Sequence, residues 1–295
     1  DEPVATATWL SHLLLCDEAA RRGFRTLFGG LGGDELNAGE YEHFFYHFAD
    51  LRRCGREREL RDEVAAWIRH HDHPVFRKSW ESVEAGLGTL VDLGNAGRCL
   101  VDRRRLERYA SALRPEFFRL ESFQPTMDGP FDSYLRNRAY QDLVRETMPC
   151  CLRAQDRHGE TLGLRHVLPF LDERLVELMF RVPGTMKIRG GVTKVLLREA
   201  MRGILPEETR TRIKKTGWNA PAHRWFSGKG AEQMLDLVRS RAFGERGIYD
   251  PDEVERLVRE HDRIVRTGEQ REDHMMFLWQ VLNVELWLRD LAGSA

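Results

Sequence analysis

The feature that most constrains this chain is a run of four glycines within residues 29–33, followed directly by an Asp-Glu pair. Four glycines in five positions cannot continue a helix or a strand, because glycine loses the most conformational freedom on ordering. Residues 24–28 before the run are β-prone, and residues 5–22 place apolar side chains at helical spacing up to a stop at Gly23. The pattern predicts a helix, a strand, a glycine loop and an acid pair, in that order.

A glycine loop that follows a strand can bind an anion, because its backbone amides can converge while a nearby carboxylate holds a divalent cation. Phosphate with Mg²⁺ is the ligand that this combination favours. The segment is not a Walker loop, because no Gly-Lys-Ser/Thr follows, and it lacks the third glycine of a dinucleotide-binding fingerprint. A plain strand-to-helix turn explains the spacing equally well, so both interpretations stay open.

A second glycine-bearing turn lies at residues 187–194, where Lys-Ile-Arg-Gly-Gly-Val-Thr-Lys opens into a predicted helix over 193–203. Thr193 is the expected N-cap, and Lys194 in the first turn would oppose the helix dipole unless an anion binds there. The chain has six lysines, and four of them fall between residues 187 and 215. This cluster indicates phosphate or proton-transfer chemistry. Chance clustering on a solvated face is the alternative.

The composition excludes several functional classes. The 295 residues suggest one large or two ordinary domains, and a net charge of −1 provides no bulk attraction to nucleic acid or to an anionic membrane. No apolar run approaches a membrane-spanning length, and no signal peptide is apparent. The five cysteines form an odd set without a C-x-x-C pair, so reduced thiols are expected. A cytoplasmic protein is predicted.

The rest of the chain is expected to be mostly helical. Apolar spacing predicts a helix over 134–152 interrupted at Pro149, another over 171–180, and a last one over 275–291. A helix should begin with Asp250 as N-cap, because proline then occupies the first helical position. Glycines loosen residues 227–250, which are the expected soft joint before the C-terminal helices.

The histidines offer no strong metal motif. His70, His71 and His73 precede a proline in a polar stretch and are interpreted as part of a surface loop. His43 and His47 lie one helical turn apart, as zinc ligands can, but without the Glu of an H-E-x-x-H motif they are expected on a half-buried helix face.

Several segments, taken together and in order, resemble the synthetase domain of glutamine-dependent asparagine synthetases over nearly the whole chain. Residues 29–36 resemble the family's Ser-Gly-Glu-Gly-x-Asp-Glu-Leu loop. Asp156 and Arg157 resemble its Asp-Arg segment, and residues 169–177 resemble its Pro-Phe-Leu-Asp segment. Residues 187–200 resemble its Lys-Ile-Arg-Gly-Gly-x-x-Lys-x-x-Leu-Arg run.

The resemblance implies a mostly helical α/β domain over residues 1–295, of the adenine-nucleotide alpha-hydrolase-like (PP-loop ATP pyrophosphatase) kind. It implies a ligase that uses ATP and Mg²⁺ to activate a carboxylate as an acyl-adenylate, which an amine then converts to an amide. Aspartate and glutamine-derived ammonia are the default substrates. Asp34 would bind Mg²⁺, and Lys194 would contact pyrophosphate and stabilise charge as the amine attacks. The implied cofactor-binding residues are Gly30, Gly32, Gly33, Arg189, Gly190 and Gly191.

The sequence departs from the family pattern at the position of the glutamate in the glycine loop, which is Leu31 here. Without that carboxylate, general-base assistance to ammonia should be weakened unless a neighbour such as Glu35 replaces it. Arg165 and Val167 also stand where the family has Glu and Arg. Relatives that close β-lactam or lasso-peptide rings vary the glycine-loop position as well, so an amide-forming tailoring enzyme or cyclase with another amine is an alternative.

Nothing in the chain resembles the family's Ser-Gly-Gly-x-Asp-Ser pyrophosphate loop or its N-terminal glutaminase domain, and the sequence begins at Asp1 rather than Met. A fragment or a truncated product is therefore expected, working with a glutaminase domain or subunit and unable to bind ATP productively by itself. A non-catalytic synthetase remnant that serves as a partner subunit is a further alternative.

Overall fold

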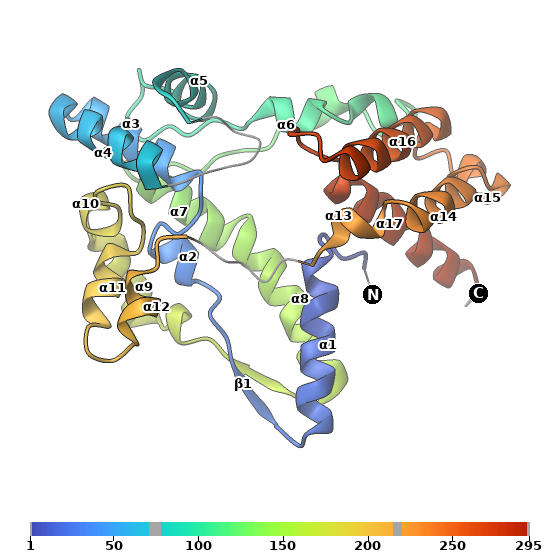
Figure 1. The fold of residues 1–295 in the computed structure, drawn as a ribbon, viewed down its shortest axis with the longest axis horizontal. Coiled ribbons are helices and arrows are strands. Elements are labelled where there is room, and N and C mark those ends of the chain that lie inside the picture. The colour runs from blue at the N-terminus through green and yellow to red at the C-terminus, as the bar shows by residue number, and fades with distance from the viewer. Residues whose placement is uncertain (1, 71–77, 215–219, 294–295) are drawn as a thin grey trace. The chain divides into compact units, whose positions relative to one another are not determined.

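The computed structural model describes residues 2–70, 78–214 and 220–293, which form two compact units. The central unit comprises residues 16–101 and 125–217. The terminal unit comprises residues 1–15, 102–124 and 218–295. The described chain is a mostly helical α/β protein with one small parallel sheet (Figure 1).

The helices and strands follow the chain order in Figure 1. Helix α1 (Thr8–Arg21) contains the boundary at residue 15. The central unit continues with β1 (Thr26–Phe28), α2 (Gly33–Leu36), α3 (His43–Arg53), α4 (Glu57–His70), α5 (Trp80–Leu90), α7 (Tyr134–Val144), α8 (Thr147–Leu162), β2 (Arg165–Val167), α9 (Glu173–Arg181), α10 (Gly184–Lys187), α11 (Val195–Ala200) and α12 (Glu207–Thr211). The terminal unit contains α6 (Arg103–Glu107), α13 (Ala222–Trp225), α14 (Lys229–Val238), α15 (Arg241–Glu245), α16 (Pro251–Thr267) and α17 (Met275–Gly293). Short 3₁₀ helices lie at Ala110–Ala112, Leu120–Ser122 and Pro169–Leu171.

The predicted strand before the glycine loop is present as β1, and the predicted helix before it is α1, with Gly23 at φ 86° just beyond its end. β1 pairs in parallel with β2, and Leu27 lies opposite His166. The amide of Gly29 donates to the carbonyl of Val167 at 2.9 Å, which extends this pairing into the glycine loop. The loop therefore starts at the carboxyl end of a parallel strand.

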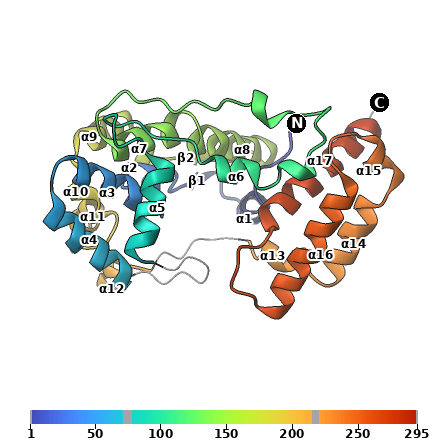
Figure 2. The same cartoon turned by 90° about the horizontal axis from the view of Figure 1, so that it is seen from above.

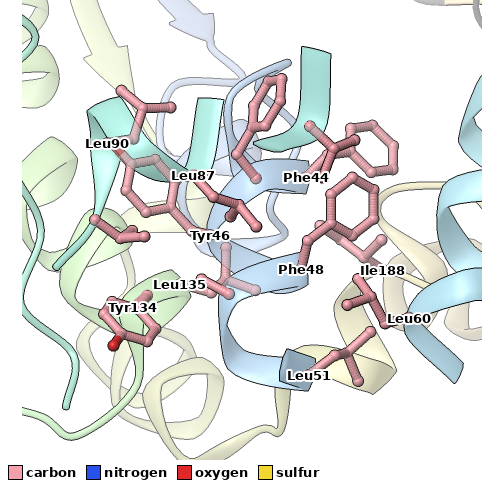
Figure 3. Close-up of a cluster of buried hydrophobic side chains, with 14 of the residues drawn as sticks. Phe44, Tyr46, Phe48, Leu51, Leu60, Leu87, Leu90, Tyr134, Leu135 and Ile188 are labelled. Carbon is pink, nitrogen blue, oxygen red and sulfur yellow. The ribbon is translucent and has the colours of Figure 1, made fainter. Parts of the chain in front are cut away.

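The core of the central unit is built around aromatic side chains of α3. Phe44, Tyr46 and Phe48 pack with side chains of α4, α5 and α7 (Figure 3). Trp67 of α4 is fully buried, and its ring lies 5.8 Å from the ring of Phe48 between centroids. Burying one such side chain contributes roughly 1.5–3 kcal/mol. This cluster fixes α4 against α3, and α4 is the helix that contacts the second glycine turn.

The expectation for His43 and His47 is corrected, because both are buried rather than half-buried, with exposures of 1% and 2%. His43 Nε2 lies 3.0 Å from Asp142 Oδ2 on α7, and Arg138 also pairs with this carboxylate. Burial lowers the pKa of His47 to about 4, so it stays a neutral core histidine. Neighbouring elements, which helical spacing cannot reveal, cover this face.

The terminal unit is helical, and its best-marked start is confirmed. Asp250 accepts a hydrogen bond from the amide of Glu253 at 3.1 Å, and Pro251 is the first residue of α16. Figure 2 shows α14 lying alongside α16, and Met234 and Leu257 from these helices are in the same buried cluster. Residues 227–250 form α14 and α15 within this unit.

Two local expectations were wrong. Pro149 does not interrupt a helix, because the break lies at residues 145–146 and Pro149 falls in the first turn of α8, where a missing amide costs no intrahelical bond. Thr193 is not the N-cap of α11, because Lys194 takes that position in the left-handed conformation. Residues 71–73 of the histidine stretch lie outside the described residues.

The next two observations, on disulfides and on membrane-spanning helices, hold for the described residues. All five cysteines lie in the described segments, and none of them is joined to another by a disulfide there. Over those segments, none of the helices combines the length and apolar character needed to cross a membrane.

Candidate active site

The first glycine turn, residues 29–33, is shaped by close packing. Gly32 adopts φ 88° at the N-cap of α2, and a Cβ there would overlap the side chain of Leu171. A Cβ at Gly33 would lie 3.4 Å from the ring of Phe170. Gly30 is different, because a Cβ there would meet nothing within 4 Å. The Pro-Phe-Leu segment that the sequence singled out therefore packs against this turn.

The turn presents Asp34, and the structure pairs it with Lys194. The Lys194 ammonium forms an ion pair with Asp34 Oδ1, although the two residues are far apart in sequence. Their side chains are 31% and 27% exposed, so the pair is reachable by a ligand. Gly39 packs against both side chains, because a Cβ at this position would lie 2.6 Å from Lys194 Cε and would overlap the Asp34 carboxylate. The two residues with the most specific predicted roles are thus brought together.

Lys194 is held by its backbone as well. It adopts φ 59°, one of two positive values at non-glycine residues in the described chain, and its amide donates to the carbonyl of Asn37 at 3.2 Å. A left-handed conformation at a lysine costs roughly 1–2 kcal/mol, so the surroundings must impose it. Asn37 follows α2 directly, which ties the Lys194 backbone to the helix that carries Asp34.

The second glycine turn, residues 189–192, contacts α4. Gly190 and Gly191 adopt φ 62° and 69°, and their amides donate to the two carboxylate oxygens of Glu63 at 2.6 and 2.9 Å. Arg189 is exposed. The pKa of Glu199 is lowered mainly by a hydrogen bond from Arg202, and the charge of Arg189 lowers it further. The structure therefore places Glu63 at the amides that were expected to bind an anion. The sequence does not single out Glu63, because nothing in its pattern distinguishes it from the other acidic residues of α4.

Glu35, the neighbour of Asp34, is buried with 5% of its surface exposed. Burial raises the pKa of its carboxyl, and the negative charges of Asp34, Glu40 and Asp142 raise it further. The loop residue Leu31, four positions before Glu35, is partly buried. The acidic side chain that could replace the missing loop glutamate is therefore largely withdrawn from solvent.

A cavity of about 460 Å³ lies beside the first turn in the central unit. It contains the Asp156-Arg157 segment, and its walls come from α8 and β2. Gly29 adjoins it, because a Cβ at Gly29 would lie 2.8 Å from Leu168 and 3.4 Å from Gln155, both of which line the cavity. The full lining is Leu152, Arg153, Gln155, Asp156, Arg157, His166 and Leu168. The Asp-Arg segment and the start of the first glycine turn thus lie next to one concave region.

Comparison with known proteins identifies sequence relatives of this chain. The Asparagine synthase family model matches residues 1–289. Glutamine-hydrolyzing asparagine synthetase 1 of Bacillus subtilis (strain 168) is 28% identical over 129 residues, which are 44% of this chain and 19% of that protein. Asparagine synthetase 3 of the same strain is 34% identical over 119 residues, which are 40% of this chain and 19% of that protein.

A putative glutamine-hydrolyzing asparagine synthetase of Mycobacterium tuberculosis (strain ATCC 25618 / H37Rv) is 32% identical over 130 residues, which are 44% of this chain and 18% of that protein. The matched segments thus cover less than a fifth of each relative's length. No solved structure gives a significant match. Because the family model spans nearly the whole sequence, the chain belongs to the asparagine synthase family.

Proposed function

We propose that this chain is the synthetase portion of an ATP-dependent, AMP-forming amide ligase, with aspartate as the carboxylate and glutamine-derived ammonia as the amine. The observation that supports this most directly is the ion pair between Asp34 and Lys194, which joins the two family segments of most specific predicted role. Its fold is proposed to be of the adenine-nucleotide alpha-hydrolase-like kind, and its location cytoplasmic. A glutaminase domain or subunit is the proposed source of ammonia.

Lys194 is the proposed catalytic residue. A carboxylate gains a good leaving group when ATP converts it to an acyl-adenylate, and pyrophosphate departs with several negative charges. A fixed ammonium stabilises such charge best when it is already oriented, because no reorganisation is then needed during the reaction. The Lys194 ammonium has this property, because its backbone is bonded to Asn37 and its side chain is bracketed by Gly39 and Asp34.

Asp34 is the proposed Mg²⁺ residue, and the site fits this ion. Mg²⁺ in nucleotide enzymes is usually bound through one or two carboxylates together with substrate phosphates and water. Asp34 offers one partly exposed carboxylate beside a cation suited to phosphate, so it matches the protein share of such a site. The ion supplies neutralisation of phosphate charge when bound.

The glycines are proposed to support the nucleotide in two ways. Gly30 has open space at its α-carbon, so its backbone can be approached closely by a ligand. Gly32 and Gly33 set the turn that orients Asp34. Gly190, Gly191 and the exposed Arg189 are proposed to line the phosphate side near Lys194, with the two glycine amides bonded to the Glu63 carboxylate.

A second candidate is an amide-forming tailoring enzyme or cyclase that couples an amine other than ammonia. It is favoured by Leu31, because Glu35, the acidic neighbour that could replace the loop glutamate, is 5% exposed and poorly placed to take a proton from a small amine. Arg165 and Val167 also differ from the family pattern. They flank His166 on β2, and His166 lines the cavity, so this difference lies near the proposed substrate region.

The test uses the natural full-length gene product with Mg²⁺, in an assay of carboxylate-dependent exchange between ATP and radiolabelled pyrophosphate. Exchange with aspartate, and its conversion to asparagine with glutamine or ammonia, is the result we expect. Exchange with another carboxylate, without asparagine formation, would select the second candidate. A folded protein that gives no exchange with any carboxylate would refute both and leave a non-catalytic partner subunit.

A further inference from the structure

The turn that leads to Lys194 is held by a carboxylate that belongs to the protein itself. Gly190 and Gly191 both have positive φ, and consecutive amides in such a conformation point into one concavity that suits an anion. The Glu63 carboxylate fills that concavity, with Oε1 on Gly190 and Oε2 on Gly191. Charged acceptors make stronger hydrogen bonds than neutral ones, so this is a firm two-point attachment to α4.

Packing against the same helix allows only one position for the turn. A Cβ at Gly191 would lie 2.5 Å from the amide nitrogen of Trp67 and 2.6 Å from the carbonyl carbon of Ala66, so the turn backbone touches the backbone of α4. Within the turn, the amide of Arg189 donates to the carbonyl of Val192 at 3.0 Å, and the reverse bond is 3.2 Å. The Trp67 side chain anchors this part of α4 in the core.

Lys194 lies three residues after Gly191, and its positive φ is strained for a residue with a side chain. Its ammonium meets Asp34 on α2, so Lys194 bridges from the turn on α4 to the first glycine turn. If the 189–192 turn were loose, the amide bond to Asn37 and the ion pair would have to order the whole segment alone. The attachment at Glu63 removes most of that freedom before any ligand arrives, which is how preorganisation lowers the cost of binding and catalysis.

We propose that Glu63 is a positioning residue, whose carboxylate holds the 189–192 turn on α4 and thereby places the Lys194 ammonium beside Asp34. Glu63 itself touches neither substrate nor reacting atoms in this scheme. The inference rests on the proposed function for its catalytic consequence, whereas the placement of Lys194 is a property of the chain that can be measured separately.

The test compares Glu63→Ala, Glu63→Gln and a matched control, Glu59→Gln, in the full-length protein. Glu59 lies on the same helix and pairs with Arg56 at the surface. The first measurement is the rate at which an amine-acylating reagent labels Lys194, read by peptide mass spectrometry with Lys229 as internal reference. Labelling of Lys194 should rise several-fold in Glu63→Ala and stay at the wild-type rate in Glu59→Gln.

The second measurement is ATP–pyrophosphate exchange. We expect kcat to fall about 10- to 100-fold in Glu63→Ala, because small misplacements of a catalytic group have effects of this size, while KM for ATP changes less. Glu63→Gln should recover part of the loss, because its amide oxygen can accept one of the two hydrogen bonds.

Unchanged Lys194 labelling in a folded Glu63→Ala protein would overturn the positioning role, even if activity fell. Increased labelling with unchanged kcat would also overturn it. A wild-type protein without exchange would refute the proposed function instead, and the labelling result would then decide the placement of Lys194 independently. Thermal unfolding of each variant shows whether the fold is intact.

Discussion

The two glycine turns of the central unit look alike in sequence, but different contacts hold them. The turn at residues 29–33 packs against apolar side chains of Phe170 and Leu171, and its α-carbons have little room except at Gly30. The turn at residues 189–192 is held by polar contacts, with two amides on the Glu63 carboxylate. A glycine-rich turn therefore has no single meaning. Its partners decide whether its amides face a ligand, the core or an internal anion.

The comparison also separates the glycines by the reason each is required. Gly191 and Gly32 combine positive φ with steric conflict, Gly190 has positive φ and open space, and Gly30 has open space alone. Each class predicts a different balance between loss of stability and loss of activity.

The largest effect is expected where the two turns meet. Lys194→Ala should reduce ATP–pyrophosphate exchange by about 10²–10³-fold, because it removes a preorganised cation from a developing negative charge. Lys229→Ala, at the exposed start of α14, is the matched control and should exchange like the wild type. Exchange kinetics at saturating carboxylate measure the difference. Equal rates in the two variants would show that the meeting point of the turns is only structural.

Within the second turn, Gly191→Ala should destabilise the protein by about 2–3 kcal/mol, because a methyl group would collide with backbone atoms of α4 that cannot move aside. Gly190→Ala should cost only about 1 kcal/mol, because alanine disfavours the positive φ but its methyl group would collide with nothing there. Urea unfolding of both variants gives the two values. A larger loss for Gly190→Ala would contradict the described packing of the turn.

In the first turn, Gly32→Ala should cost about 1–2 kcal/mol, because the residue has positive φ and the Leu171 side chain must shift. Gly30→Ala should leave stability nearly unchanged, since its site is open. A drop in exchange activity for Gly30→Ala, at unchanged stability, would sharpen the comparison by showing that this amide faces the nucleotide. Both quantities are measured on the same purified variants.

The smallest effect concerns the carboxylate next to the first turn. Burial raises the pKa of Glu35 above its ordinary value of 4.5, so the folded state resists its ionisation. Its contribution to stability is complete below the unfolded pKa and is lost as pH rises through the folded pKa. Glu35→Gln should therefore unfold like the wild type in acid and be the more stable protein at neutral pH. Parallel stability curves for the two proteins from pH 4 to 7 would contradict this.

Local features of the chain were predictable where neighbouring residues alone decide them. The start of α16 followed from Asp250 and Pro251, because a cap and a first-turn proline act within one helical turn. The glycine turn after β1 followed from glycine density. Predictions that depended on what covers a surface were weaker, as the full burial of His43 and His47 shows.

The amino-acid sequence by itself determined the local conformations and the chemical groups available. Capping, glycine freedom and helical periodicity act over a few residues, so they can be recognised without the fold. The folded arrangement alone decided that β1 pairs with β2, that Lys194 rather than Thr193 starts α11, and that Glu63 occupies the amides of Gly190 and Gly191. These outcomes join residues separated by more than a hundred positions or impose a strained backbone. The energy for both comes from tertiary packing, which no short window of sequence contains.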